Sequence, residues 1–373
     1  MKKVTIKASL IAVALASSLY SCKKNQNTPP ASSPYNISQT NLVSNFAGAN
    51  AAKLDTNLAN AWGLAANPDG IIWVSSNQKS LTTVYDSTGQ TVNPPVIIPA
   101  FNAVAGSPTG IVYNNTTDFG GSLFIFAGEN GTLSAWTGGN VAVTVAGAGS
   151  PDAVYKGLTL GSDAGTNFLY AADLKTGKVD VFDKGFNHVG DKPFTDPTMP
   201  AGFAPFNVQN IGGMLYVTYA KQKGPDNVND DPAPGNGFVD IFKTDGTFVK
   251  RFASNGTLNS PWGITHAPAG FAAATETILV GNFGDGRINV FDLNGNYLGQ
   301  LQSNGKPLVI VGLWALDFLK TSPTAASKLY FTAGPGGESQ GILGYLKNSS
   351  ISSTGSGSGG SGNTGSGGGN PGY

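Results

Sequence analysis

Polar residues that could form a ligand site recur at one point of a repeated pattern, between an apolar run and the alternating run that follows it. They are Asn77, Glu129, Asn130, Asp173, Asn282, Asp285, Arg287 and Glu338. The chain contains three Glu residues, and two of them, Glu129 and Glu338, belong to this set. Carboxylate, amide and guanidinium groups that converge over a mostly apolar surface are typical of a ligand site. Asn and Asp are also common turn formers, so a purely structural role is the alternative.

One longer loop could bind a metal ion. The segment KQKGPDNVNDDPAPGNG, residues 221–237, contains Asp226, Asn227, Asn229 and Asp231. Oxygen ligands clustered on a flexible loop suit a hard cation such as Ca²⁺. The segment lacks the central Gly and the distal Glu of an EF-hand loop. The sequence therefore indicates a calcium site here, with a solvated acidic loop as the alternative.

Other chemistries lack their residues. The chain has no HExxH motif and a single cysteine, so zinc hydrolysis and CxxC redox chemistry have no candidates. Lys and Arg together number 22, as do Asp and Glu, and the formal net charge is zero. A nucleic-acid partner would require a basic surface, so none is expected.

A repeat places the polar residues. A short apolar anchor with a small third residue occurs six times: Ala61–Leu64, Pro108–Ile111, Tyr155–Leu158, Pro205–Val208, Pro261–Ile264 and Leu313–Leu316. Successive third residues are 47, 47, 50, 56 and 52 residues apart. Repeats of this length are typical of propeller blades or solenoid turns, and four strands per repeat suit a propeller. Trp62, Trp262 and Trp314 occupy equivalent anchor positions, which predicts that they pack between blades.

Each anchor is followed by an apolar run, an alternating run, a turn and, in the first five repeats, a fourth run. Period-two alternation of Val, Ile and aromatic residues indicates half-buried strands. The sixth repeat ends at Lys347 without a fourth strand, whereas the strand-like segment Asn41–Phe46 precedes the first repeat. We therefore predict an all-β, six-bladed β-propeller whose last blade is closed by an N-terminal strand, with an open solenoid as the alternative.

Several long segments carry a family resemblance: Phe203–Gln222, Gly235–Phe242, Leu258–Phe271, Leu279–Asp292, Gly312–Phe318 and Leu329–Gly344. They resemble NHL-like six-bladed propellers and, more closely, an uncharacterised bacterial family of predicted propellers first described alongside exosortase-sorted (PEP-CTERM) proteins. The resemblance covers essentially all of residues 41–347 and implies the propeller fold. It implies no established activity, and no apolar C-terminal sorting helix follows in this sequence.

The N-terminus predicts export. Lys2 and Lys3 precede the apolar run Ala8–Tyr20 and the small residue Ser21, which are the parts of a secretory signal. The segment Leu19–Cys22 resembles a bacterial lipobox, in which Cys22 is acylated, for example with palmitate, and becomes the first mature residue. An ordinary signal peptide is the alternative. We predict a lipoprotein signal peptide over residues 1–21, a disordered tether over 22–40, the propeller over 41–347 and a disordered Gly/Ser-rich tail over 348–373.

Together these features predict an exported protein, lipid-anchored to the cell envelope through Cys22, that acts as a binding or interaction module. Its ligand would be a small molecule, a glycan or a protein on the loop face. The alternative is a Ca²⁺-assisted hydrolase or lyase, with Glu129, Asp173, Asn282 and Asp285 around an ion at the channel mouth.

Overall fold

The computed structural model describes residues 1, 35–101, 105–147, 152–190, 192–319 and 326–350. The chain divides into two units, Met1–Ala31 and Ser32–Tyr373, and all described secondary structure lies in the second. The predicted signal peptide and Cys22 lie outside the described residues, apart from Met1, as does the predicted tail beyond Ser350. No helix in the described part of the chain has the length and apolar character needed to cross a membrane.

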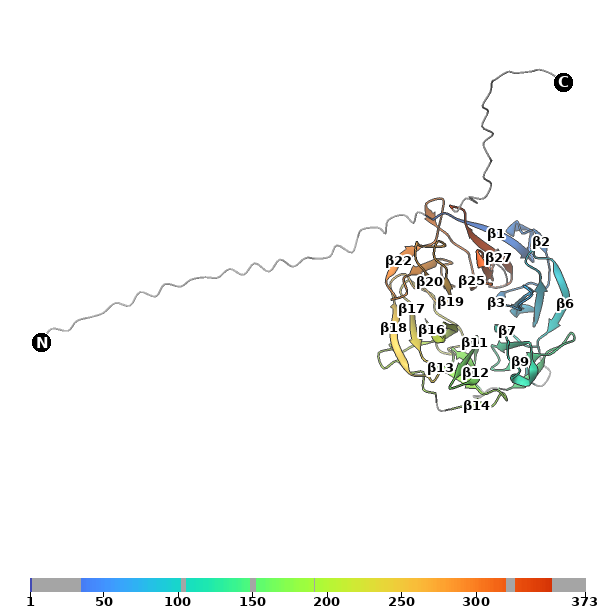
Figure 1. The fold of residues 1–373 in the computed structure, drawn as a ribbon, viewed down its shortest axis with the longest axis horizontal. Coiled ribbons are helices and arrows are strands. Elements are labelled where there is room, and N and C mark those ends of the chain that lie inside the picture. Colours follow the sequence, from blue (N-terminus) through green and yellow to red (C-terminus); the bar gives the residue numbers. More distant parts are fainter. Residues whose placement is uncertain (2–34, 102–104, 148–151, 191, 320–325, 351–373) are drawn as a thin grey trace, which may run out of the picture. The chain divides into compact units, whose positions relative to one another are not determined.

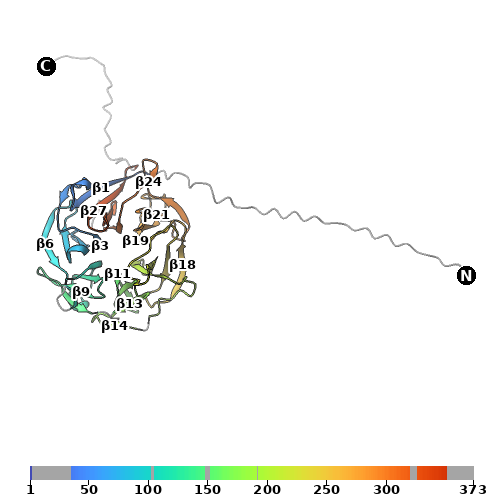
Figure 2. The ribbon, with the colours of Figure 1, turned by 180° about the vertical axis from the view of Figure 1, so that it is seen from behind.

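Six antiparallel sheets of four or more strands surround a central axis in the described residues (Figures 1 and 2). Blade 1 contains β3 (Ala61–Ala66), β4 (Ile72–Ser76), β5 (Leu81–Tyr85) and β6 (Thr91–Ile97). Blade 2 contains β7 (Pro108–Tyr113), β8 (Phe124–Gly128), β9 (Leu133–Trp136) and β10 (Val143–Ala146). Blade 3 contains β11 (Tyr155–Asp163), β12 (Thr166–Asp173), β13 (Lys178–Phe182) and the short β14 (His188–Val189).

The remaining blades follow in chain order. Blade 4 contains β15 (Phe203–Ile211), β16 (Met214–Lys221), β17 (Gly237–Phe242) and β18 (Phe248–Ser254). Blade 5 contains β19 (Pro261–Ala267), β20 (Thr277–Asn282), β21 (Ile288–Phe291) and β22 (Tyr297–Gln300), followed by the small hairpin β23 (Gln302–Ser303) and β24 (Lys306–Pro307). Short 3₁₀ segments within the described ranges lie between strands, namely η1 (Ala47–Ala49), η2 (Asn77–Lys79) and η4 (Phe119–Gly121). The predicted six-bladed, all-β propeller is thus confirmed.

Blade 6 joins the two ends of the propeller. Its strands are β25 (Leu313–Phe318), β26 (Leu329–Ala333), β27 (Ile342–Asn348), β1 (Ile37–Ser44) and β2 (Lys53–Leu54). β1 runs antiparallel to β27, from the pair Ile37–Asn348 to the pair Ser44–Ile342. The predicted closure by an N-terminal strand is confirmed, and Figure 1 shows β1 beside β27.

The predicted boundaries of the propeller are too narrow at both ends. β1 begins at Ile37, which is fully buried, so the prediction of a tether through residue 40 is wrong for residues 37–40. At the other end Asn348 belongs to β27, and its side-chain amide donates hydrogen bonds to the carbonyls of Gly270 (2.9 Å) and Phe271 (3.1 Å). A polar residue that pairs with backbone carbonyls across a loop carries no hydrophobic signal, which explains why the pattern missed it.

The small third residue of each anchor has a steric cause. The innermost strands approach one another closely: a Cβ on Gly63 would lie 2.3 Å from the Thr109 carbonyl oxygen, and one on Gly110 would lie 2.4 Å from the Leu158 nitrogen. No side chain fits such gaps. Blade 4 differs, because it has Asn207 there, whose amide donates to the Trp262 carbonyl at 2.8 Å. The small third residue of the anchor is therefore explained by the close contact between the innermost strands of neighbouring blades.

Candidate functional site

Bulky side chains fill one end of the central channel. They come from the second anchor position of four blades, namely Trp62, Phe206, Trp262 and Trp314, and all four are buried. Trp62 and Trp314 stack with ring centroids 3.7 Å apart, and Trp262 meets both rings edge-on. The predicted packing of the three tryptophans between blades is confirmed. This aromatic plug lies where the innermost strands begin, on the same face as the loops between second and third strands, which we call the loop face.

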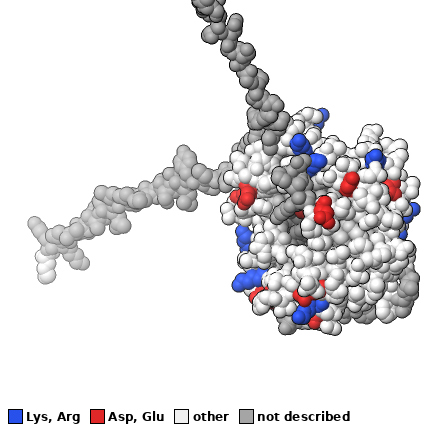
Figure 3. Space-filling view, turned by 45° about the vertical axis from the view of Figure 1, so that its right-hand side comes forward, with Lys and Arg blue, Asp and Glu red and all other residues white. Residues whose placement is uncertain are grey.

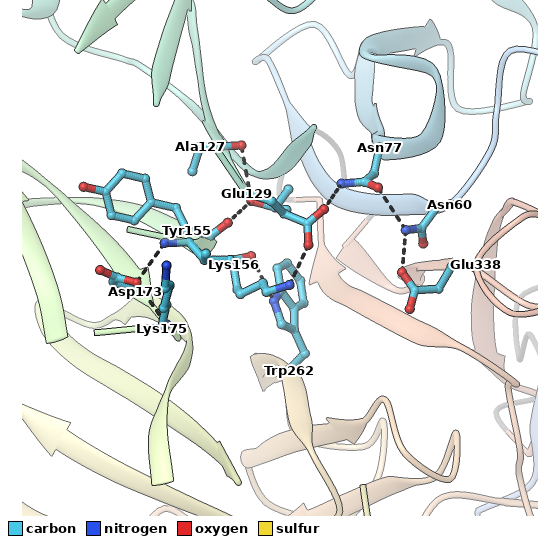
Figure 4. Close-up of polar contacts among 12 residues, drawn as sticks. Asn60, Asn77, Ala127, Glu129, Tyr155, Lys156, Asp173, Lys175, Trp262 and Glu338 are labelled. Atoms are coloured by element: carbon cyan, nitrogen blue, oxygen red, sulfur yellow. Dashed lines mark hydrogen bonds and ion pairs between the residues drawn. The ribbon is translucent and has the colours of Figure 1, made fainter. Parts of the chain in front are cut away.

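Lys156 lies over the plug. It follows the first residue of β11 in the same second anchor position, and its side chain is only 2% exposed. Its Nζ lies 2.5 Å from Glu129 Oε1 and 5.3 Å from the centroid of the Trp62 ring. Trp262 Nε1 donates to the Lys156 carbonyl at 3.1 Å, as Figure 4 shows. An ammonium group removed from water is stabilised here by a carboxylate and an aromatic face.

A chain of side-chain hydrogen bonds extends from this ion pair across four blades (Figure 4). Asn77 Nδ2 donates to Glu129 Oε2 at 2.9 Å, and Asn60 Nδ2 lies 3.3 Å from Asn77 Oδ1 and 2.8 Å from Glu338 Oε2. Trp314 Nε1 donates to Asn60 Oδ1 at 2.9 Å, which fixes the orientation of the Asn60 amide above the plug. The polar cluster, defined as Asn60, Asn77, Glu129, Lys156 and Glu338, is thus one connected unit.

The polar cluster carries more negative than positive charge. Burial raises the pKa of Glu338, and the nearby charge of Glu129 raises it further, while Lys156 and the Asn60 hydrogen bond lower it. Glu338 also has a left-handed backbone (φ 66°), which is uncommon for a residue with a side chain and is often found at functional sites. Asp230, from the long loop of blade 4, has its pKa raised chiefly by burial and lowered by Lys156 among others. The charge of Lys156 thus acts on Glu338 and Asp230 in addition to its ion pair with Glu129.

Other predicted residues serve their own blades. Asp173 accepts hydrogen bonds from the backbone nitrogens of Val154 (2.9 Å) and Lys175 (3.0 Å). Asn282 donates to Asp285 Oδ1 at 3.0 Å and, like Asp285, is bonded within blade 5. Asn130 accepts from Thr132 within its own turn, and Arg287 is exposed. Asp173, Asn282 and Asp285 thus stabilise turns through their hydrogen bonds. The enzyme alternative requires Glu129, Asp173, Asn282 and Asp285 to surround one ion, and no contact among the described residues brings these four together.

A comparison of sequences relates the chain to viral proteins. Uncharacterized protein L690 of Acanthamoeba polyphaga mimivirus is 33% identical over 340 residues, which span 85% of this chain and 86% of that protein. Uncharacterized protein R648 of the same virus is 33% identical over 333 residues, spanning 83% of this chain and 80% of that protein. The chain belongs to their family. No protein-family model matches it.

Solved structures support the propeller fold and nothing finer. A protein of unknown function from Bacteroides thetaiotaomicron superposes with a TM-score of 0.55 at 12% identity, covering 84% of this chain and 76% of that one. A streptogramin B lyase superposes with a TM-score of 0.51 at 13% identity, covering 84% and 98%. Identities this low say nothing about activity. The resemblance to a bacterial PEP-CTERM-associated family stays a prediction, because the relatives that define the family here are viral.

The candidate calcium ligands in the long loop of blade 4 differ in their exposure to solvent. In this member of the L690 and R648 family, Asp226 and Asn229 are exposed, Asn227 is half-buried, and Asp231 lies 3.9 Å from Lys221 at the surface. Across the described residues no three His, Cys, Asp or Glu side chains are grouped so as to hold a metal ion. The calcium site proposed from Asp226, Asn227, Asn229 and Asp231 stays a prediction.

Sequence reasoning found Glu129 and Glu338 but missed Lys156, Asn60 and Asp230. A signal for Lys156 was available: the second anchor positions are Trp62, Thr109, Lys156, Phe206, Trp262 and Trp314, and only one of them is charged. A charge in a position that is otherwise uncharged and faces the channel indicates a partner there. Asn60 and Asp230 gave no such signal, because both stand among other polar loop residues.

The loop that bears Glu338 also contains a Gly-x-Ser-x-Gly sequence, Gly337–Gly341. It does not form a nucleophile elbow, because it connects two strands, β26 and β27, rather than a strand and a helix. Ser339 Oγ donates to the Gly336 carbonyl at 2.7 Å. The two histidines lie elsewhere, His188 beside Asp180 and His266 beside Glu276. The described contacts thus provide no catalytic triad.

Proposed function

We propose that this chain is an exported, lipid-anchored β-propeller that acts as a binding module at the cell envelope, and that its polar cluster binds a cationic group. The observation that carries the proposal is the charge imbalance at the channel mouth. Lys156 forms an ion pair with Glu129, and its charge also lowers the pKa of Glu338 and of Asp230. Burial disfavours this excess of carboxylates, so an added cation would be stabilised by them.

The exposure of the carboxyl groups supports this direction of binding. Lys156 is buried beneath the surface, whereas Glu129 is 28% exposed and Glu338 is half-buried. A ligand that approaches the loop face therefore meets carboxylates before it meets the ammonium. On the side of the molecule that Figure 3 shows, charged side chains are sparse and of mixed sign. A protonated amine or a guanidinium of a peptide fits these acceptors.

The test compares two peptides of equal length and opposite charge. Full-length protein would be titrated with hexalysine and hexaglutamate, and binding followed by the intrinsic fluorescence of the plug tryptophans. We expect saturable binding of hexalysine only, weakened about 10-fold or more by Glu338→Gln, because a charge-assisted hydrogen bond is lost. A matched control is Glu276→Gln, which removes a carboxylate beside His266, away from the polar cluster. Equal binding of both peptides, or equal loss in both variants, would contradict the proposal.

The lipid anchor has a separate test. Cys22→Ser removes the residue proposed for acylation, so the protein should move from the membrane fraction to the soluble fraction. A serine variant that remains in the membrane fraction would show that another segment holds it there.

A further inference from the structure

The open part of the channel lies at the end opposite the polar cluster. Three cavities of about 40, 390 and 520 Å³ have Gln209 and Asp317 in common among their lining residues. We call the three adjoining cavities together the exit-face cavity, because the innermost strands end there. Ala66, Asn210 and Asp317 mark the ends of β3, β15 and β25 at its wide part.

The exit-face cavity ends inside the molecule. Trp262, part of the aromatic plug, lines its narrow inner portion together with Gly63 and Gly263. The stacked rings of Trp62 and Trp314 lie behind Trp262. The cavity is therefore a pocket with a floor, and its wider parts fall within the ~300–1,000 Å³ typical of small-molecule sites.

The walls combine aliphatic surface with amides. Leu64, Ile111 and Leu160 supply the aliphatic part, and no Lys or Arg is among the lining residues that the structure describes. The ionisable side chains among the described lining residues are Asp317, Tyr113, Tyr216 and, at one edge, His266. The carboxyl group of Asp317 disfavours an anionic ligand, because like charges repel.

Gln209 is the polar group best placed to recognise a ligand. It lines all three parts of the cavity, and its side-chain amide has no hydrogen-bond partner among the described residues. The neighbouring Asn210 is already satisfied, because its Nδ2 donates to the Leu160 carbonyl (3.0 Å) and its Oδ1 accepts from the Gly213 nitrogen (3.0 Å). The Gln amide both donates and accepts, and so does a hydroxyl group.

We propose that the exit-face cavity is a binding site for an uncharged, hydroxyl-bearing molecule of mono- or disaccharide size. Gln209 hydrogen-bonds the hydroxyl groups, and the aliphatic walls pack against the carbon skeleton. The site is independent of the proposed function, because the polar cluster lies on the other side of the aromatic plug.

The test uses sugars that differ in charge. Saturation-transfer NMR on the full-length protein would compare glucose, galactose, maltose and cellobiose with glucuronate and galacturonate. At least one neutral sugar should bind saturably, and neither uronate should. Gln209→Leu, which keeps the side-chain size, should weaken binding about 10-fold through loss of hydrogen bonds. Gln78→Leu, the same change at an exposed position of the loop face, should leave it unchanged.

A second variant guards against misfolding. Asn115 is exposed at the rim of the cavity, so Asn115→Ala should leave the melting temperature intact and still weaken binding several-fold. The proposal is overturned if no neutral sugar saturates, if the uronates bind equally well, or if both cavity variants bind like the unmodified chain.

Discussion

Removing the ammonium from the polar cluster is the most direct test of how the channel mouth is stabilised. Lys156→Met keeps the length and apolar stem of the side chain but leaves Glu129 without its partner at 2.5 Å. Removing one member of a buried ion pair destabilises a protein by ~3–5 kcal/mol. Glu129 is 28% exposed and keeps its hydrogen bond from Asn77, so water and the amide compensate in part. We therefore expect a loss of ~2–3 kcal/mol in the free energy of unfolding at pH 7.

The double variant separates the charge effect from packing. In Glu129→Gln/Lys156→Met neither charge remains, so at least half of the lost stability should return, with a coupling energy of ~1–3 kcal/mol between the two sites. The loss in Lys156→Met should also shrink as the pH falls. Lys156 lowers the pKa of Glu338, so its removal raises that pKa further, and protonation then relieves the excess negative charge.

The assay is urea denaturation of the full-length protein followed by tryptophan fluorescence at pH 5, 7 and 8. The Lys156 ammonium lies over the Trp62 ring, which contacts Trp262 and Trp314, so the signal reports on the region that is changed. The reasoning is refuted if Lys156→Met loses less than ~1 kcal/mol, or if the double variant is no more stable than the single one.

Three further predictions concern other parts of the propeller. Arg251 bridges the buried carboxylates of Asp196 and Asp240, and burial raises the pKa of Asp240 to about 7, so the stability that Asp240 contributes is present below about pH 4 and is lost as the pH rises through 7. Thermal melts of Asp240→Asn from pH 5 to 8 should therefore show a flatter pH dependence than those of the unmodified chain, and an unchanged slope would contradict this. Deleting residues 37–44 should destabilise the fold by several kcal/mol, because it removes β1 with its buried Ile37, Leu42 and Val43. Ending the chain after Ser350 should leave the melting temperature unchanged, and a C-terminal truncation that destabilises the fold more than the N-terminal one would disprove the closure argument. If the blade 4 loop binds Ca²⁺, the ion should raise the melting temperature, and Asp226→Ala/Asp231→Ala should abolish the rise; a calcium effect that survives both changes would place the site elsewhere.

The architecture could be predicted because each blade encodes its strands locally. Alternation within runs such as Lys178–Phe182 depends only on which side of a sheet a residue faces, and the small third anchor residue records contact between neighbouring blades. Closure followed from counting strands. The exact start of β1 did not, because Ser38, Gln39 and Thr40 are polar residues at an exposed edge and resemble a linker.

The site was predicted only in part, for a geometric reason. Glu129 and Glu338 belong to loops that any propeller gathers on one face, so topology alone brings them together. Lys156 and Asn60 stand at the starts of innermost strands, and their side-chain directions are determined by ring closure and by the Trp262 and Trp314 indoles that bond to them. Contacts between residues 254 positions apart, such as Asn60 and Trp314, have no counterpart in local pattern.

The same closure makes the two ends of the channel chemically different. At the loop face the second anchor positions present large side chains toward the axis, so the channel is filled and its surface groups are charged. Further along the same strands Ala65 and Ala66 replace bulk with small side chains, and Gln209 replaces charge with an amide. A strand of only six residues, such as β3, thus passes from a tryptophan in the plug beneath the polar cluster to an alanine beside the exit-face cavity. Because the plug separates the two ends, a ligand at one of them changes the other only if it moves the rings of Trp62, Trp262 or Trp314, and their fluorescence would report that movement.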